Sequence, residues 1–257
     1  HEMTERDSLL QARGLCKQFG GLAAVKDVSL DLWLGRLHAV IGPNGAGKST
    51  LTNLLSGDLP PTSGHIVLNG QDVTGLGADA ISRAGLGRSY QKTNIFPSFT
   101  VWENIRLAAQ SRAQPMPFNP LGWMRSALGM ASVNARAERA LEMMGLQSRR
   151  DHIAAAASHG EQRQLEIAMT LATEPRVLLL DEPLAGMGVA EAERMVALLL
   201  QLKADHAVLL VEHDIDAIFT LADHMTVMVN GQVIASDLPE VVRADPAVQA
   251  AYLGEDH

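Results

Sequence analysis

The chain opens with hydrophobic positions that alternate with polar ones. Between Val28 and Leu34 every second residue is Val or Leu, which is typical of a half-buried strand. The opening stretch is therefore predicted to form strands joined by a turn at Gly20-Gly21. Strand-forming residues also flank Asn69-Gly70 and Asn230-Gly231. Because both residue types tolerate positive φ, these pairs predict hairpins, so antiparallel strands come from both ends of the chain.

The middle of the chain carries a helical pattern instead. Residues 101–145 give no strand signal and predict a separate helical lobe, interrupted by a proline-rich loop at 114–120. Strand–helix alternation then resumes, with apolar runs at 177–180 and 207–211 around a helical pattern. Such alternation predicts a parallel sheet. The expected fold class is α/β, with a parallel core sheet, an antiparallel β subdomain and an inserted helical lobe.

The composition of the chain argues against several classes of protein. The chain has 257 residues, of which 47% are hydrophobic and 19% charged, as in an ordinary folded domain. Its net charge of −8 argues against a nucleic-acid-binding surface. The single cysteine, Cys16, rules out an internal disulfide and suits a reducing cytoplasm. The longest apolar run, Met195–Leu200, is far shorter than the roughly 18 residues that span a bilayer, so we expect a soluble chain.

One segment indicates chemistry directly, because residues 42–50 fit the pattern G-x-x-x-x-G-K-[ST]. Its glycines let backbone N–H groups surround a triphosphate, while Lys48 places a cation on the β- and γ-phosphates and Ser49 can ligate Mg²⁺. An apolar strand precedes the segment and a helix follows, so the helix N-terminus adds positive charge. The residues expected to bind a nucleoside triphosphate are Gly42, Pro43, Asn44, Gly45, Ala46, Gly47, Lys48, Ser49 and Thr50.

An acidic pair follows the apolar run at 177–180. Asp181 can hold the Mg²⁺ shell, and Glu182 can polarise a water for attack on the γ-phosphate. Alone, such a pair is more often the solvated start of a loop. Together with Lys48, it predicts that the pair acts on the γ-phosphate of a bound nucleotide.

A third segment opens a helix predicted at 163–172. Ser158, Gly160 and Glu161 make another helix N-terminus suited to an anion. With the two nucleotide motifs, this segment resembles the signature of ATP-binding cassette (ABC) ATPases, Leu-Ser-Gly-Gly-Gln or a near variant. The chain has Ala157 for the leucine and His159 for the first glycine. The resemblance implies that Ser158, Gly160 and Glu161 contact the nucleotide.

The resemblance extends to further positions. Gln91 matches the family's Q-loop glutamine, which reaches Mg²⁺ and the attacking water. His213 matches the switch histidine that touches the γ-phosphate. Phe19 stands where the family stacks an aromatic on adenine, although a core phenylalanine is an alternative. The chain departs at Gly188, where many relatives have an aspartate.

The resemblance covers nearly the whole chain and implies one ABC domain over residues 1–257. A RecA-like core with antiparallel strands is expected at 4–91 and 166–257, and a helical lobe at about 92–165. The implied cofactors are ATP and Mg²⁺. The implied catalytic residues are Glu182, His213 and Gln91. The implied metal ligands are Ser49, Gln91 and Asp181.

Within this family the chain resembles the importer ATPases for branched-chain amino acids and related small amides. The enlarged helical stretch, the segments 162–168 and 185–188 and the tail 250–254 carry the likeness. It implies a second ABC ATPase chain (identical or paralogous), membrane permease subunits and, indirectly, a periplasmic solute-binding protein. The cassette is then cytoplasmic and peripheral on the inner face of a bacterial plasma membrane, with no nucleic-acid partner.

Other cassette classes make different predictions. A translation factor would carry two cassettes, and a DNA-repair ATPase would insert a long coiled coil between Gln91 and Ser158. A non-hydrolysing regulator would lack Glu182 or His213. The sequence fits none of these three. The cassette of an exporter that extracts lipid or lipopolysaccharide uses the same motor and stays open as the alternative.

Overall fold

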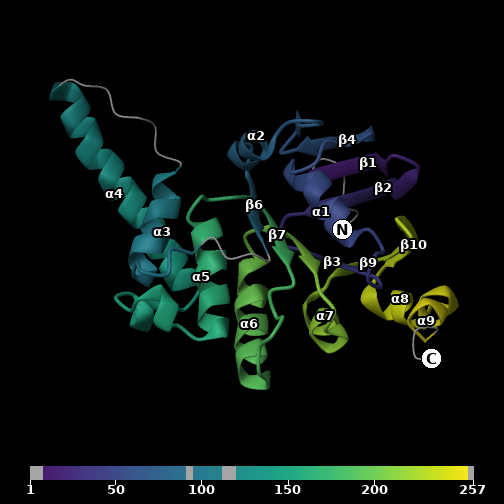
Figure 1. The fold of residues 1–257 in the computed structure, drawn as a ribbon. Coiled ribbons are helices and arrows are strands. Elements are labelled where there is room, and N and C mark those ends of the chain that lie inside the picture. The colour runs from purple at the N-terminus through teal and green to yellow at the C-terminus, as the bar shows by residue number, and fades with distance from the viewer. Residues whose placement is uncertain (1–7, 91–94, 112–119, 254–257) are drawn as a thin grey trace. The chain divides into compact units, whose positions relative to one another are not determined.

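The computed structural model describes residues 8–90, 95–111 and 120–253 (Figure 1). The chain divides into two compact units. Unit 1 comprises residues 1–88, 176–183 and 199–257, and unit 2 comprises residues 89–175 and 184–198. Unit 2 thus spans the region expected as a helical lobe, about 92–165, and also includes residues 184–198.

The strands come mainly from the two ends of the chain. They are β1 (Ser8–Phe19), β2 (Leu22–Trp33), β3 (Leu37–Ile41), β4 (Ser63–Leu68), β5 (Gln71–Asp72), β6 (Leu86–Ser89), β7 (Val177–Asp181), β8 (Ala207–Val211), β9 (His224–Val229) and β10 (Gln232–Asp237).

Helices follow most of the parallel strands and fill the middle of the chain. They are α1 (Lys48–Ser56), α2 (Ala78–Arg83), α3 (Val101–Gln110), α4 (Pro120–Met143), α5 (His159–Leu171), α6 (Val189–Leu202), α7 (Ile215–Leu221), α8 (Pro239–Ala244) and α9 (Pro246–Leu253). Short 3₁₀ turns cover Gln147–Arg149 and Ala154–Ala156.

The strands form two sheets that confirm the expected fold class. One is antiparallel, in the order β2-β1-β4-β5, and the other has the order β10-β9-β3-β8-β7-β6. Within the second sheet β3 runs parallel to β8 and β9, and β7 runs parallel to β8. Every residue of β3, β7 and β8 is buried, as expected for parallel strands covered on both faces.

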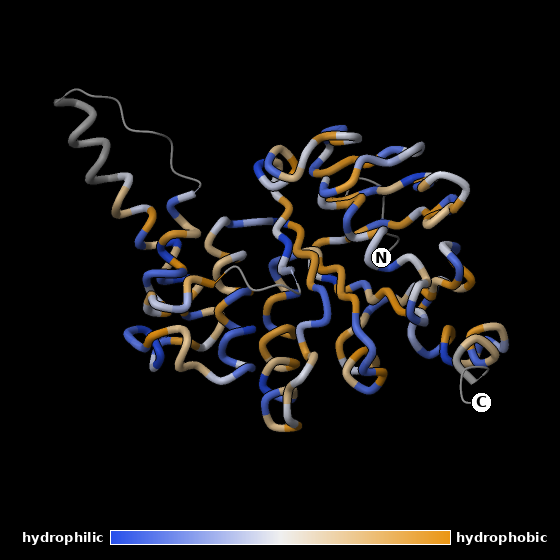
Figure 2. Tube along the Cα trace, in the orientation of Figure 1, coloured by the Kyte–Doolittle hydropathy of each residue, from blue (hydrophilic) through white to orange (hydrophobic). Residues whose placement is uncertain are grey.

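Helix α1 is fixed inside the core of unit 1. Leu51, Leu54 and Leu55 are buried in one cluster with Leu15 of β1 and Leu209 of β8, and apolar residues follow the central strands (Figure 2). Burying a leucine contributes roughly 1.5–3 kcal/mol. The helix is therefore a rigid support for the loop that precedes it.

The predicted turns form as expected. Asn69 and Asn230 adopt positive φ of 50° and 51°, and each begins a turn between antiparallel strands. Gly20, at φ 58°, lies between β1 and β2.

Unit 2 is built mainly from α3, α4 and α5. Helix α3 begins with a capping box, in which Thr100 and Glu103 exchange side-chain and backbone hydrogen bonds. Ile105 of α3, Leu141 of α4 and Leu165 of α5 are fully or almost fully buried. Among the residues described, no helix is both long and apolar enough to cross a membrane.

Candidate functional site

The parallel strands bring the predicted nucleotide residues of unit 1 to one edge of the sheet. The loop 42–47 follows β3, Asp181 ends β7, and His213 lies just after β8. Because parallel strands end at the same edge, ligands of such sheets bind there. A cavity of about 550 Å³ lies at this edge, and its lining includes Asn44, Lys48, Ser49, Glu182 and His213.

The N-terminus of α1 is open toward this cavity. Gly47 caps the helix at φ 101°, and a Cβ there would lie 2.6 Å from the carbonyl oxygen of Ala24. Among the described residues no side chain makes a capping hydrogen bond to this end, and its first turn has no acidic residue. The N–H groups and the positive end of the helix dipole are thus available for an anion.

Lys48 stabilises the curled shape of the loop 42–47. Its side chain is buried, and Nζ donates hydrogen bonds to the carbonyl oxygens of Gly42 and, at 3.0 Å, Pro43. An ammonium group carries three donors. Lys48 thus lies in the loop where the sequence predicts the β- and γ-phosphates.

Glu182 and His213 meet directly. The Nε2 of His213 lies 2.8 Å from Oε1 of Glu182 and donates to that carboxylate. Glu182 has a left-handed backbone, with φ 48°, and its N–H donates to Val211 at 2.8 Å. Such a conformation in a non-glycine residue costs on the order of 1–3 kcal/mol and is typical of functional sites. The two predicted catalytic side chains are therefore adjacent.

Asp181 is buried beside them, with an exposed fraction of 7%. Burial raises the pKa of its carboxyl above the ordinary value, a nearby Arg88 guanidinium opposes this rise, and Glu182 adds to it. No cluster of three or more His, Cys, Asp or Glu side chains suited to a metal ion occurs in the described part of the chain. A metal held by Ser49 and Asp181 therefore needs further oxygen ligands, which fits Mg²⁺ bound together with nucleotide phosphates.

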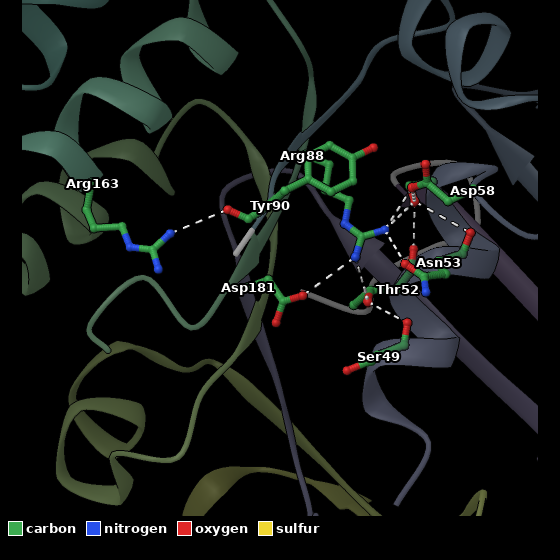
Figure 3. Close-up of polar contacts among 9 residues, drawn as sticks. Ser49, Thr52, Asn53, Asp58, Arg88, Tyr90, Arg163 and Asp181 are labelled. Carbon is green, nitrogen blue, oxygen red and sulfur yellow. Dashed lines mark hydrogen bonds and ion pairs between the residues drawn. The ribbon is translucent and has the colours of Figure 1, made fainter. Parts of the chain in front are cut away.

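Arg88 is a residue of this region that sequence reasoning missed. It lies on β6, where its side chain is only 7% exposed, and it contacts both Asp181 and the end of α1 (Figure 3). An arginine within a short strand that enters the predicted Q-loop was the available signal. Gln91 itself lies outside the described residues. In unit 2, the preceding Tyr90 accepts a hydrogen bond from Arg163 at 3.4 Å on its carbonyl oxygen.

The predicted signature forms the N-terminus of α5 in unit 2. Ser158 Oγ accepts from the N–H of Glu161 at 3.2 Å, and Glu161 accepts from the N–H of Ser158 at 2.9 Å, which completes a capping box. This backbone donor holds the pKa of the Glu161 carboxyl below its usual value, and Arg149 adds to the effect at 2.7 Å.

A second acid, which sequence reasoning also missed, binds the same serine. Ser158 Oγ donates to Oε1 of Glu191 at 2.9 Å. The carboxylate lies so close to Gly160 that a Cβ there would come within 2.8 Å of it. His159, which replaces a signature glycine, donates from Nε2 to the carbonyl oxygen of Ala185 at 2.9 Å. The signature is thus tied to the segment after Glu182 within its own chain.

Phe19 lies at the end of β1 in unit 1. Its side chain is 47% exposed, and Lys17 Nζ lies 5.4 Å from its ring centroid. The ring is therefore not part of the core.

The sequence profile of the ABC transporter family matches residues 25–185. The chain belongs to the ABC transporter family. The tail of this ABC cassette, residues 232–257, matches a second profile, that of the branched-chain amino acid ATP-binding cassette transporter. As an ABC transporter ATPase it binds ATP and couples hydrolysis to transport. Such ATPases act with permease subunits and as paired cassettes.

The ABC cassette is similar over its length to two proteins named for branched-chain amino acid transport. It is 36% identical to the high-affinity transport ATP-binding protein LivG of Escherichia coli K12. It is 38% identical to the high-affinity transport ATP-binding protein BraF of Pseudomonas aeruginosa. Both alignments span 252 residues, 96% of this chain and 98% of the relative.

Solved structures agree with this placement. The crystal structure of the ADP conformation of MJ1267, an ATP-binding cassette of an ABC transporter, superposes with a TM-score of 0.83 at 30% identity. The superposition covers 96% of this chain and 99% of the other. A nucleotide-free ATP-binding cassette from an ABC transporter gives 0.82, also at 30% identity.

Proposed function

We propose that this cassette powers the import of a branched-chain amino acid or a related small amide. The observation that carries the proposal is the full-length similarity to LivG and BraF, supported by the matching tail at 232–257. An exporter of lipid or lipopolysaccharide shares the catalytic motor. The similarity to amino-acid transport ATPases favours the importer.

In the proposed reaction the residues of unit 1 act on one ATP. The loop 42–50 and the N-terminus of α1 hold the phosphates, and Ser49, Asp181 and Gln91 would hold Mg²⁺. Such an ion neutralises charge on the β- and γ-phosphates. Glu182 accepts a proton from the attacking water. Its hydrogen bond from His213 fixes the orientation of that carboxylate.

Phe19 is proposed to stack on the adenine. Its exposed ring leaves a face for a base, and aromatic stacking adds about 0.5–1.5 kcal/mol beyond burial. Replacing Phe19 with Ala should therefore weaken ATP binding by about tenfold at most, measured by calorimetric titration. A change in thermal stability with no change in affinity would instead assign Phe19 to packing.

The second side of the site is proposed to come from another cassette, identical or paralogous. The N-terminus of α5, with Ser158, Gly160 and Glu161, supplies donors to the γ-phosphate held by the first chain. A twofold arrangement completes both sites through the same surface. The hydroxyl proton of Ser158, which goes to Glu191 within the chain, must then turn to the phosphate.

The permease subunits are proposed to dock beside Phe96, on the inner face of a bacterial plasma membrane. Phe96 is 52% exposed and stacks on Phe99 at 5.3 Å between ring centroids. The buried Asn104 side chain binds both the N–H and the carbonyl oxygen of Phe96, at 2.8 and 3.0 Å. An exposed aromatic pair on a fixed loop is typical of a docking surface.

Uptake in cells tests the proposed solute. The gene for this chain is deleted, and entry of radiolabelled leucine, urea and short amides is followed. We expect uptake of at least one of them to fall and to return with the wild-type gene, but not with Glu182→Gln. Unchanged uptake together with a defect in lipid or lipopolysaccharide export would assign the cassette to an exporter.

A further inference from the structure

Arg88 places a buried positive charge between two parts of the nucleotide site in unit 1. It lies on β6, which is the neighbour of β7 in the sheet. Its guanidinium points toward α1 on one side and toward Asp181 on the other (Figure 3). A buried arginine is expected to be paired, because an isolated buried charge is costly.

One end of the guanidinium binds the C-terminal end of α1. Nη1 donates to Asn53 at 2.7 Å, to Ser56 at 2.7 Å and to Asp58 at 2.9 Å. A cation at this end of a helix is favoured by the helix dipole. These contacts fix the arginine to the helix.

The other end lies near the groups expected to handle the metal. Nη2 is 3.6 Å from Oδ2 of Asp181, an ion pair, and 3.3 Å from Oγ1 of Thr52. Thr52 in turn donates to the carbonyl oxygen of Ser49 at 2.9 Å. One side chain therefore connects Asp181 to the turn of α1 that carries Ser49.

We propose that Arg88 is a positioning residue that holds the Asp181 carboxylate in register with Ser49 for binding of Mg²⁺ together with ATP. The inference rests on the proposed metal role of those two residues. We assign it to positioning because its contacts join α1 to Asp181. The planar guanidinium of Arg88 contacts α1 through one nitrogen and Asp181 through another at the same time, which the single ammonium group of a lysine cannot reproduce.

The test is how strongly Mg²⁺ improves nucleotide binding. Affinity for a non-hydrolysable ATP analogue is measured by calorimetry with and without Mg²⁺, in wild type and in Arg88→Met. The ratio of the affinity with Mg²⁺ to the affinity without Mg²⁺ is called the gain from Mg²⁺. We expect this gain to fall by about tenfold in Arg88→Met, as is common when a partner of a metal ligand is removed. Affinity without Mg²⁺ should change less than about twofold. A folded Arg88→Met variant that keeps the full gain would overturn the inference.

Asp58→Asn is the matched control. It removes the negative charge of one partner of the same guanidinium at the α1 end and leaves the Asp181 end intact. It should lower the melting temperature and keep the gain from Mg²⁺. If Asp58→Asn lost that gain as fully as Arg88→Met, Arg88 would serve the fold alone and the inference would fail.

Two further variants keep the test decisive. If Arg88→Met does not fold, Arg88→Lys replaces it, and we expect at least about a threefold loss of the gain because the planar guanidinium is absent; an unchanged gain overturns the inference. Asp181→Asn is measured in parallel. If it keeps the full gain, the metal role of Asp181 fails and the inference fails with it. If Asp181→Asn loses the gain from Mg²⁺ and the Arg88 variants keep it, the role of Arg88 is rejected while the metal role of Asp181 stands.

Discussion

We propose that the N-terminus of α1 in one chain and the N-terminus of α5 in a second chain face the same γ-phosphate. These two helix ends are nevertheless capped in opposite ways. Helix α1 is preceded by Gly47, and among the described residues neither a side-chain cap nor a first-turn acid occupies its end. Helix α5 carries a complete capping box between Ser158 and Glu161. Its serine is also bound to the Glu191 carboxylate.

The two helix ends therefore differ in how readily each can bind a phosphate. The end of α1 begins with a lysine and has no acid in its first turn, so it suits a phosphate without rearrangement of a competing acid. The end of α5 has its own carboxylates in the place where an anion would be favoured. In the proposed pair of cassettes the phosphate would therefore compete with Glu191 for the proton of Ser158.

We infer an order of events from this contrast. ATP binds first to the α1 side, and the α5 side of a second chain joins only when a γ-phosphate can replace Glu191 as the acceptor. This order makes the closed pair of cassettes dependent on ATP.

The largest expected effect comes from Glu182→Gln. This variant should trap the dimer in which the N-termini of α1 and α5 bind one γ-phosphate. The amide keeps the size of the side chain but cannot take a proton, so phosphate release should fall by ~10²–10⁴-fold. ATP binding should persist, and gel filtration should show an ATP-dependent dimer. Phosphate release near the wild-type rate would remove Glu182 from the role of base.

A smaller effect is expected from Glu191→Gln, made in the Glu182→Gln background so that ATP persists. A neutral acceptor binds the hydroxyl of Ser158 less strongly than a carboxylate does. The ATP concentration that gives half-maximal dimer should fall by about fivefold, measured by light scattering.

The matched control is Glu193→Gln, which removes an exposed carboxylate from the same helix α6 and should leave this concentration unchanged. If Glu191→Gln instead raised the ATP concentration that gives half-maximal dimer, Glu191 would stabilise the signature segment and would not compete with the phosphate for Ser158.

The smallest effect is a dependence on pH confined to α5. The pKa of the Glu161 carboxyl is held below its usual value, about 4.3, first by the N–H of Ser158. The stabilisation by this ion is therefore present above that usual value and is lost as the pH falls through the lower folded-state pKa.

Hydrogen exchange, corrected for its intrinsic pH dependence, should show the first amides of α5 losing protection in this acid range. The first amides of α1, which has no first-turn acid, should show no such step. Glu161→Gln should remove the step from α5. A step of equal size at both helices would mean that the whole chain loosens.

Features set by neighbouring residues were predictable from the sequence. The hairpin at Asn69 depends on the φ preference of that residue and of the glycine that follows it, and the phosphate loop on a short pattern that ends at Lys48. The buried strand before Asp181 was equally clear from its apolar run. Each of these predictions uses residues close together in the chain, so no tertiary information is needed.

Arg88 and Glu191 could not be found in this way, because their partners are distant in the sequence. Arg88 meets Asp58 thirty residues away, and Glu191 meets Ser158 thirty-three residues away. Only the fold brings these groups into contact. The left-handed backbone of Glu182 was likewise invisible, since nothing in its residue type favours positive φ.

The central claim is that the open end of α1 and the capped end of α5 complete one site from two chains. The most direct test mixes two inactive variants, Lys48→Ala and Ser158→Arg, and measures phosphate release. In a mixed dimer one site carries both lesions and the other carries neither, so the mixture should recover up to about a quarter of wild-type activity. A mixture as inactive as either parent would contradict the shared site.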